Sequence, residues 1–182
     1  MSLQFVTTNP GKVREATDYL AAFFDVEQYD YDYAEVQSDD LAEIAARGAE
    51  EAFEAAGGDD PVIVDDAGLF VDGLDGFPGP YSSYVEDTLG IERVWRLAES
   101  LDDRSAAFRC TVAYADGETV ATFDGEIPGE IVAPRGDGGF GYDPIFEHGG
   151  ETFAEMGTER KNELSHRGRA LAKLADWLAE RA

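Results

Sequence analysis

The sequence is poor in positive charge. Its 14 Lys and Arg residues, of which three are Lys, stand against 39 Asp and Glu residues, and the formal net charge is −25. Nucleic acids and anionic membrane surfaces are bound through clusters of Lys and Arg, which contact phosphate groups. The scarcity of these residues argues against both, so we expect neither nucleic acid nor membrane among the partners.

Cysteine and long apolar runs are also scarce. Cys110 is the sole cysteine, which excludes an intramolecular disulfide and indicates a reducing compartment. Because Cys110 lies in an apolar run, we expect a buried, inert thiol rather than a nucleophile. No segment approaches the ~18 apolar residues of a membrane span. The N-terminal sequence MSLQFVTTNPGK lacks the basic and apolar regions of a signal peptide, so we expect a cytoplasmic protein.

Acidic residues are in excess and are spread along the whole sequence. The 20 Asp and 19 Glu residues are not gathered into a tail, which argues against an acidic interaction segment. So high a charge destabilises a compact state by self-repulsion. Near molar salt, however, the Debye length falls to about 3 Å and most of that penalty disappears. We therefore expect a halophilic-type protein of a salt-loaded cytoplasm.

The composition and the apolar pattern predict a folded α/β protein. Hydrophobic residues make up 43% and aromatic residues 12% of the chain, and residues 1–182 are expected to form a single domain. Strand and helix periodicities alternate, which predicts a mixed twisted sheet flanked by helices. The expected strands are Leu3–Thr8, Val26–Tyr33, Val62–Val64, Ala106–Tyr114 and Val120–Ile127, the last two joined at Asp116-Gly117. The expected helices run from Pro10 to about Phe24, from Asp39 or Asp40 to about Ala56, through Ile91–Ala98, and from about Thr158 to Glu180.

The first segment that can carry chemistry is Thr7-Thr8-Asn9-Pro10-Gly11-Lys12, where a strand turns into a helix. Backbone N–H groups at a helix N-terminus form an anion site, to which Thr7, Asn9 and Lys12 would add donors and one positive charge. Asn9 can equally be a simple N-cap, followed by Pro10 at the first helical position. The spacing leaves both interpretations open.

The second segment, Asp65-Asp66-Ala67-Gly68, is expected at a strand end. A carboxylate in this position can hold Mg²⁺ together with substrate phosphate oxygens, or orient a water molecule. Adjacent strand residues face opposite sides, so the two carboxylates need not share one ligand. The alternative is a solvated acidic turn of an acidic protein.

Two later segments have the composition of a ligand site. In Gly138–Pro144 the glycines let the backbone approach a ligand, and Phe140 and Tyr142 can stack on a base. The alternative is a turn with two core aromatics. The segment Lys161–Arg167 lies within Thr158–Lys173, whose five cations against two acidic residues give a net charge of +3. The rest of the chain then carries −28, so we favour a functional role for this cationic segment over a random solvated face.

The order of the motifs shows a family resemblance. The segments TTNPGK, DDAGL, FPGPYS, PRG, GFGYDPIF, AEM and KNELSHR resemble the non-canonical purine NTP pyrophosphatase family, also called inosine triphosphate (XTP/dITP) pyrophosphatases. The resemblance extends from Thr7 to Leu174. It implies two lobes with the active-site cleft between them, Mg²⁺ as cofactor and a homodimer. The implied reaction hydrolyses ITP, dITP and XTP to the monophosphate and pyrophosphate, which removes deaminated purines from the nucleotide pool.

The resemblance also implies roles for individual residues. Glu35, Asp65 and Asp66 match metal-binding acids of the family, and Asp66 also matches its general base. Ala67 departs from the pattern, since the family usually has Ser or Thr there, and Arg47 occupies the region where many members have a Lys. The matches to substrate-binding residues are Thr7, Thr8, Asn9, Gly11, Lys12, Ala67, Phe140, Gly141, Tyr142, Asp143, Lys161, Ser165, His166 and Arg167.

In the implied mechanism, Asp66 orients or deprotonates a water molecule that attacks the α-phosphorus. Pyrophosphate then leaves, with its charge balanced by Mg²⁺, Lys12 and neighbouring cations. Donors such as His166 or Arg167 facing O6 would accept hypoxanthine or xanthine and oppose the amino group of adenine. Two alternatives stay open: a related nucleotide pyrophosphatase for other modified nucleotides, and a non-catalytic nucleotide-binding protein.

Overall fold

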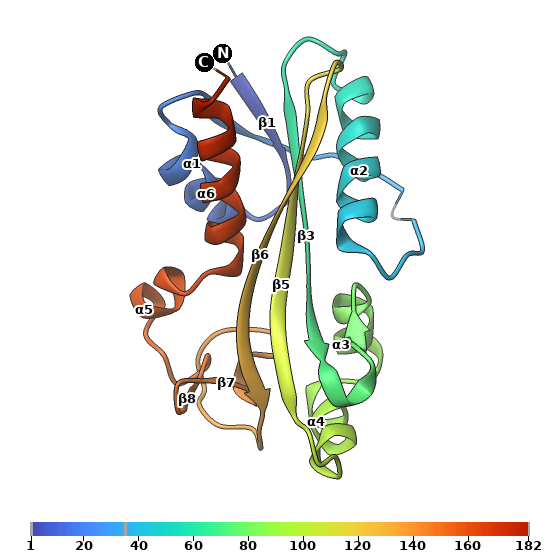
Figure 1. Cartoon of the computed structure of the whole chain (residues 1–182), viewed down its shortest axis with the longest axis vertical. Coiled ribbons are helices and arrows are strands. Elements are labelled where there is room, and N and C mark those ends of the chain that lie inside the picture. Colours follow the sequence, from blue (N-terminus) through green and yellow to red (C-terminus); the bar gives the residue numbers. More distant parts are fainter. Residues whose placement is uncertain (1, 35, 182) are drawn as a thin grey trace. The chain divides into compact units, whose positions relative to one another are not determined.

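The computed structural model describes residues 2–34 and 36–181 (Figure 1). These described residues form an α/β fold on an eight-stranded sheet of order β2-β1-β3-β5-β6-β7-β8, with β4 paired to β3, which confirms the expected fold class. The strands are β1 (Ser2–Val6), β2 (Asp25–Tyr29), β3 (Val62–Val71), β4 (Pro78–Gly79), β5 (Ser105–Ala115), β6 (Val120–Ile131), β7 (Phe146–His148) and β8 (Glu151–Thr152). The helices are α1 (Pro10–Leu20), α2 (Leu41–Ala55), α3 (Ser82–Thr88), α4 (Ile91–Glu99), α5 (Thr158–Glu163) and α6 (His166–Ala179), with 3₁₀ turns η1 (Asp72–Leu74) and η2 (Asp143–Ile145).

The chain divides into two compact units, whose boundaries fall inside β3, β5, β6 and α6. Unit 1 consists of Met1–Asp66, Cys110–Gly125 and Arg167–Ala182. Unit 2 consists of Ala67–Arg109 and Glu126–His166. The single domain expected from the length stays a prediction.

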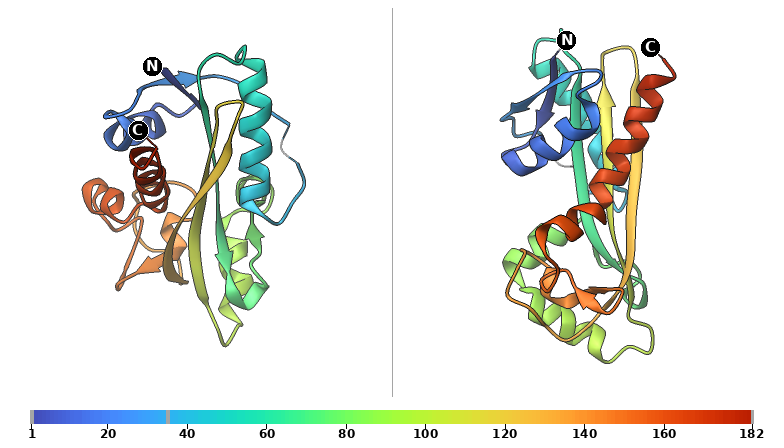
Figure 2. Two further views of the ribbon diagram at one scale, coloured as in Figure 1. Left: turned by 45° about the horizontal axis from the view of Figure 1, so that its top comes forward. Right: turned by 90° about the vertical axis from the view of Figure 1, so that its left-hand side faces the viewer.

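Unit 1 is a sheet covered by helices on both faces. Strand β1 pairs in parallel with both β2 and β3. Helix α2 covers one face of this part of the sheet, and α1 and α6 lie on the other (Figures 1 and 2). The small side chains Ala45, Ala49 and Ala52 recur at helical spacing on α2 and are fully buried in a cluster that includes Val62 and Val64. This close packing fixes the part of β3 that leads to the two aspartates.

Both long helices of the N-terminal half begin at a side-chain cap. The Asn9 Oδ1 atom accepts from the Gly11 N–H over 2.8 Å at the start of α1. Asp40 Oδ1 accepts from the Ala42 N–H over 2.9 Å at the start of α2. Such caps satisfy amide groups that the helix itself leaves unpaired. Of the two cap candidates for the second helix, Asp40 is therefore the one used.

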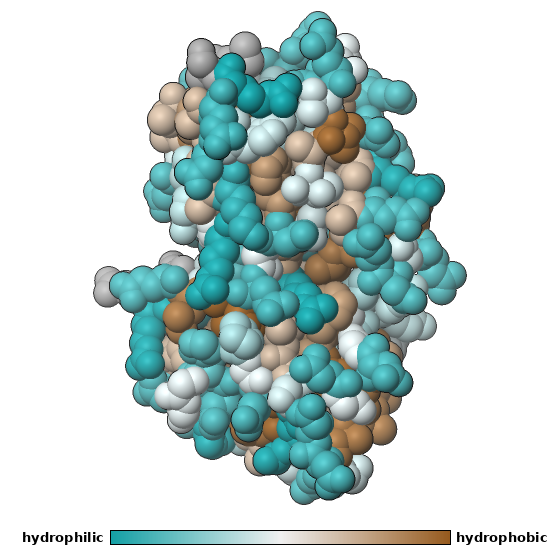
Figure 3. Space-filling model, viewed as in Figure 1, coloured by the Kyte–Doolittle hydropathy of each residue, from teal (hydrophilic) through white to brown (hydrophobic). Residues whose placement is uncertain are grey.

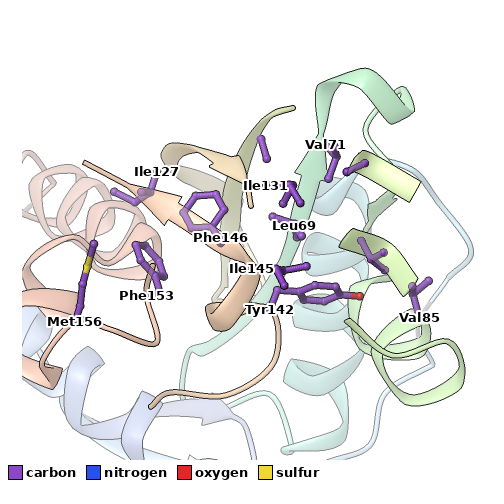
Figure 4. Packing of buried hydrophobic residues seen from close by; sticks show 13 residues of the cluster. Leu69, Val71, Val85, Ile127, Ile131, Tyr142, Ile145, Phe146, Phe153 and Met156 are labelled. Atoms are coloured by element: carbon purple, nitrogen blue, oxygen red, sulfur yellow. The ribbon is translucent and has the colours of Figure 1, made fainter. Parts of the chain in front are cut away.

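Unit 2 is built around a cluster of aromatic and branched side chains. Strands β6, β7 and β8 pair antiparallel in succession, while β3 pairs antiparallel with β4. Phe146 packs against both Phe108 and Phe153, with ring centroids 4.6 Å and 4.9 Å away. Figure 4 shows the buried cluster, which includes Leu69, Val71, Val85, Ile127, Ile131, Tyr142, Ile145, Phe146, Phe153 and Met156.

Several expected elements need correction. Strand β3 continues to Val71, so Asp65 and Asp66 lie inside a strand rather than at its end. The expected C-terminal helix is two helices, because the chain leaves helical geometry at Leu164-Ser165 between α5 and α6. Helix α3 and the short strands β4, β7 and β8 were not expected. They have seven, two, three and two residues, too few to show a periodicity.

The surface agrees with the dispersed charge of the sequence. Figure 3 shows polar residues across most of the viewed face, with apolar residues in small areas between them. Cys110 is buried, as expected for an inert thiol, and burial raises its pKa far above the ordinary value. Among the residues described, no helix has the length and apolar content needed to cross a membrane.

Candidate active site

The turn between β1 and α1 is held by its own side chains. The Asn9 N–H donates to Thr7 Oγ1 over 3.1 Å, and the Lys12 N–H donates to the Asn9 carbonyl over 3.1 Å. With Pro10 as the first helical residue, Asn9 is the N-cap of α1. The N-cap interpretation is thus confirmed. It is compatible with an anion site, which also uses the positive end of the helix dipole and the Lys12 ammonium.

Two cations converge on the carboxylate of Asp65. Lys12 Nζ lies 2.9 Å from Asp65 Oδ1, and Arg167 Nε lies 2.6 Å from Asp65 Oδ2. Arg167 Nη1 is also 3.1 Å from Glu15 Oε2. Burial would raise the pKa of Asp65, but the charges and hydrogen bonds of Arg167 and Lys12 outweigh it and lower the pKa to about 2. Asp65 is therefore ionised near neutral pH, and the four charges cancel.

Asp66 is the next residue along β3. It interacts with neighbouring groups, but its Oδ2 atom is buried without a hydrogen bond among the described residues. A buried carboxylate oxygen left in this way fits a divalent cation, which prefers oxygen ligands. Glu35, the other expected metal ligand besides Asp65, lies outside the described residues. Within residues 2–34 and 36–181, no three His, Cys, Asp or Glu side chains form a metal-binding group.

In unit 2, the buried carboxylate of Asp143 organises the glycine-rich segment. The Phe140 N–H donates to Asp143 Oδ2 over 2.7 Å, and Lys161 forms an ion pair with the same oxygen. Lys161 Nζ also lies 4.4 Å from the centroid of the Phe140 ring, which is a cation–π distance. The Phe140 residue is 76% exposed. An exposed ring anchored in this way is typical of a platform on which a base stacks.

Tyr142 has a different place from Phe140. Its ring is buried in the core of unit 2, and its hydroxyl donates to the Ser82 carbonyl over 2.8 Å. Burial raises the pKa of Tyr142, and the nearby charges of Glu86 and Asp87 raise it further. The hydroxyl therefore stays protonated and keeps its bond. Tyr142 therefore anchors the glycine-rich segment in the core of unit 2, whereas the Phe140 ring is exposed to solvent.

The chain matches known proteins along nearly its whole length. The sequence model of the Ham1 family matches residues 3–177. The chain belongs to the Ham1 family. It is 50% identical to the dITP/XTP pyrophosphatase of Methanopyrus kandleri over 97% of this chain and 96% of that protein. It is 48% identical to the dITP/XTP pyrophosphatase of Thermococcus kodakarensis over 99% and 98%.

Solved structures agree with this assignment to the Ham1 family. The Ham1 protein of Staphylococcus aureus has a TM-score of 0.89 at 30% identity and covers 100% of both chains. A Ham1 protein of Coxiella burnetii has a TM-score of 0.87 at 31% identity and covers 99% of both. The family resemblance seen in the motifs is therefore confirmed in sequence and in fold.

The predicted site residues of this Ham1 chain fall into two groups with direct contacts. One joins Lys12, Asp65 and Arg167 in unit 1, and the other joins Phe140, Asp143 and Lys161 in unit 2. The remaining predicted residues have their own positions. In unit 1, Thr8 is exposed beside the Asn9 cap. In unit 2, Ala67 follows Asp66 in β3, and Gly141 has a φ of 59°. Ser165 lies between α5 and α6, and the His166 ring stacks on the Phe108 ring with centroids 5.5 Å apart.

The cationic segment Thr158–Lys173 serves several partners rather than one. Arg160 pairs with Glu151, and Lys173 Nζ donates to the Asp124 carbonyl over 2.6 Å. Lys161 and Arg167 pair with the carboxylates described above. Arg47 forms an exposed pair with Glu43 over 2.7 Å on α2. The Ham1 chain thus directs most of its scarce cations to specific oxygen atoms.

Sequence reasoning missed three residues that hold the site in place. Glu15 is the second partner of Arg167, and the single signal for it is its position one turn after Lys12. Ser82 accepts the Tyr142 hydroxyl at its carbonyl and was seen as the end of FPGPYS without a role. Glu86 lies against the glycine-rich segment, since a Cβ on Gly141 would be 3.2 Å from Glu86 Oε2. Burial and the charges of Asp87 and Asp143 raise the pKa of Glu86.

Proposed function

We propose that this chain is a dITP/XTP pyrophosphatase, which hydrolyses dITP, ITP and XTP to the nucleoside monophosphate and pyrophosphate. The observation that carries the proposal is the near full-length identity to proteins of that name, at 50% and 48%. It is supported by the chemistry of the described residues. Lys12 lies in the first turn of a capped helix and pairs with Asp65, and Phe140 is an exposed aromatic ring beside a lysine.

The triphosphate is held by the turn between β1 and α1. Thr7, Asn9 and Gly11 order the turn, and Lys12, whose side chain is 27% exposed, supplies the positive charge. The ion cluster around Asp65 is neutral overall, so it cannot by itself balance the several negative charges of a triphosphate. This need for further positive charge supports a divalent cation, for which we propose Mg²⁺, held by Asp66 and Glu35. When bound, Mg²⁺ supplies charge neutralisation to the phosphate oxygens.

Asp66 acts as the general base in this proposal. Its carboxylate accepts a proton from a water molecule, whose oxygen forms a bond to the α-phosphorus. The bond from the α-phosphorus to the oxygen that bridges to the β-phosphorus breaks, and pyrophosphate leaves with that oxygen. Lys12 stabilises the departing charge. Catalysis of this kind is chiefly positioning and electrostatics.

The base is recognised by stacking and by donors. Phe140 stacks on the purine, and Lys161, Ser165, His166 and Arg167 supply donors to O6 and N7 of hypoxanthine or xanthine. Adenine presents an amino group in place of O6, which leaves donor facing donor. A buried polar group without a partner costs about 1–3 kcal/mol, so deaminated purines are favoured by about tenfold or more.

Replacement of Asp66 by Asn separates a hydrolase from a nucleotide-binding protein. A general base contributes about 10²–10⁴-fold, so Asp66→Asn should lower kcat for dITP by at least about a hundredfold while calorimetry still detects nucleotide binding. Asp18→Asn, on the exposed side of α1, is the matched control and should keep full activity. Unchanged turnover in Asp66→Asn would contradict the assignment of the base. Nucleotide binding without pyrophosphate release by the unmodified protein would contradict the hydrolase.

The proposal includes a homodimer in a salt-rich cytoplasm. The family resemblance supports the dimer, and the net charge of −25 supports the salt-rich compartment. Sedimentation equilibrium in molar KCl should give twice the mass of 19.8 kDa. A monomer under those conditions would contradict the dimer without affecting the proposed reaction.

A further inference from the structure

The carboxylate of Asp65 is shared by two cations to which the proposed function gives different roles, phosphate binding for Lys12 and base recognition for Arg167. Oδ1 accepts from Lys12 and Oδ2 accepts from Arg167. We infer that Asp65 is a positioning residue, which holds phosphate-binding Lys12 and base-reading Arg167 in a fixed mutual arrangement. The inference rests on the proposed function for the roles of the two cations. It assigns Asp65 a role other than the metal ligand that the family resemblance implied.

The environment of Asp65 fits an anchor for cations better than a metal ligand. Its side chain is 1% exposed, and each of its two oxygens already accepts a charge-assisted hydrogen bond. A metal ion at Asp65 would have to share the two oxygens with Lys12 and Arg167, whose positive charges already neutralise the carboxylate and would repel the ion. Asp66 differs, because its Oδ2 atom is buried without a hydrogen bond in the described part of the chain. The two neighbouring aspartates thus have different roles: Asp65 orients cations of the protein, and Asp66 is the one that would hold the divalent cation.

Arg167 is held from two sides. The Nε atom bonds Asp65 and the Nη1 atom bonds Glu15, so two different edges of one planar guanidinium are fixed. The next residue, Gly168, lets α6 approach α1 closely, since a Cβ there would lie 2.7 Å from the Tyr19 hydroxyl oxygen. Helix α6 therefore starts beside α1 (Figure 2), and its second residue, Arg167, contacts both carboxylates. A lysine at position 167 has one point charge and cannot reproduce this fork.

The exposure of the two cations agrees with their use on a ligand. The side chain of Lys12 is 27% exposed and that of Arg167 is 16% exposed, although the carboxylate between them is buried. Each cation therefore forms an ion pair with Asp65 and still exposes part of its side chain to solvent. Without the negative charge of Asp65, the two cations would repel each other, Lys12 would lose its ion pair with Asp65, and Arg167 would be held by Glu15 at one edge instead of two. The substitution Asp65→Asn should then disturb phosphate binding and base recognition at once.

The test compares Asp65→Asn with Lys12→Met and Arg167→Gln by two measurements. The first is the affinity for inorganic tripolyphosphate by calorimetry, which reports on Lys12 without a base. The second is the ratio of kcat/KM for dITP to that for dATP, which reports on base selection. Loss of a charge-assisted hydrogen bond costs about tenfold or more. Lys12→Met should weaken tripolyphosphate binding by about that factor with the ratio kept, and Arg167→Gln should lower the ratio with tripolyphosphate binding kept.

Asp65→Asn should lower both quantities by about tenfold or more, because the lost orientation of the cations outweighs the gain of one net positive charge. A purely structural role would lower the amount of folded enzyme but would leave the ratio and the affinity of the folded fraction unchanged. If Asp65→Asn keeps either quantity at the value of the unmodified protein, the assignment of Asp65 as the positioning residue of both cations is wrong. Asp18→Asn again serves as the matched control.

Two further experiments apply if Asp65→Asn does not fold or if the unmodified protein is inactive. If Asp65→Asn does not fold, Arg167→Lys keeps the charge balance and should still lower the dITP to dATP ratio with tripolyphosphate binding unchanged; an unchanged ratio overturns the inference. If the unmodified protein releases no pyrophosphate from dITP, the proposed function fails. In that case the tripolyphosphate titrations of Lys12→Met and Asp65→Asn still decide whether Asp65 orients Lys12.

Discussion

The hydroxyl of Ser82 is a buried link whose removal should weaken unit 2. Its Oγ atom accepts from the Leu69 N–H over 2.8 Å and donates to the Gly79 carbonyl over 2.7 Å. Both backbone groups lie in buried residues. A Cβ on Gly68 would lie 2.1 Å from the Gly79 oxygen and 3.0 Å from Ser82 Oγ. The site is packed so tightly that a water molecule cannot replace the hydroxyl.

The magnitude follows from the two backbone groups that Ser82→Ala leaves without this partner. Each buried group that loses its hydrogen bond costs about 1–3 kcal/mol, so the expected loss for two groups is about 2–6 kcal/mol. With a slope of about 2 kcal/mol per molar urea for a protein of this size, the unfolding midpoint should fall by about 1–3 M. The slope itself should not change, because the surface exposed on unfolding is nearly the same.

The assay uses the fluorescence of Trp95, which packs against the core of unit 2. The chain has two Trp residues, so a Trp177→Phe background leaves the signal to Trp95 alone. Ser83→Ala is the matched control, since Ser83 is the exposed neighbour in the same helix, and it should change stability by less than about 0.5 kcal/mol. Equal midpoints for Ser82→Ala and Ser83→Ala would refute the reasoning.

Three further predictions concern acid, salt and the base platform. Because the pKa of Asp65 is lowered from 3.8 to about 2, its ion pairs stabilise the fold fully above pH 3.8 by about 2 kcal/mol. This stability should be lost between pH 4 and pH 2 in the unmodified protein and not in Asp65→Asn; parallel pH profiles would contradict it. The midpoint of thermal unfolding should rise with KCl up to molar concentration, and a fall would contradict the halophilic-type expectation. Phe140→Ala should raise the KM for dITP by about tenfold with unchanged stability, whereas Tyr84→Ala, also exposed, should leave KM unchanged.

The sequence predicts best where local physical chemistry decides the structure. Caps at Asn9 and at either Asp39 or Asp40 were among the expected features, because side-chain oxygens at such positions satisfy helix amides. The helix α4 and the strands β5 and β6 were expected because their apolar residues recur at the proper spacing. The ends of helices and strands were predicted less accurately. The first helix ends at Leu20 rather than Phe24, because fraying of a helix end depends on packing beyond the segment.

The course of β3 could not be predicted from the local pattern. Asp65, Asp66 and Gly68 interrupt an apolar run, which is typical of a strand end. Asp65 is tolerated inside the strand because Lys12 and Arg167, which lie 53 and 102 residues away in sequence, neutralise it. Such partners are visible only once the chain has folded.

The same limit applies to the glycine-rich segment. Phe140 and Tyr142 are both aromatic and two residues apart, so stacking and core packing were equally open for each. Only the folded structure separates them, with Phe140 76% exposed and Tyr142 4% exposed. The motifs therefore selected the candidate residues, while their division into exposed and buried side chains came from tertiary packing.

Pyrophosphate release in molar KCl with Mg²⁺, measured in parallel for dITP, XTP, ITP, ATP and GTP, tests both the hydrolysis and the base selection. We expect release from dITP, XTP and ITP with kcat/KM about tenfold or more above that for ATP, because one polar group in the base site is mismatched with adenine. Equal kcat/KM for ITP and ATP would contradict the proposed base selection. No pyrophosphate from any of the five nucleotides would contradict the pyrophosphatase itself.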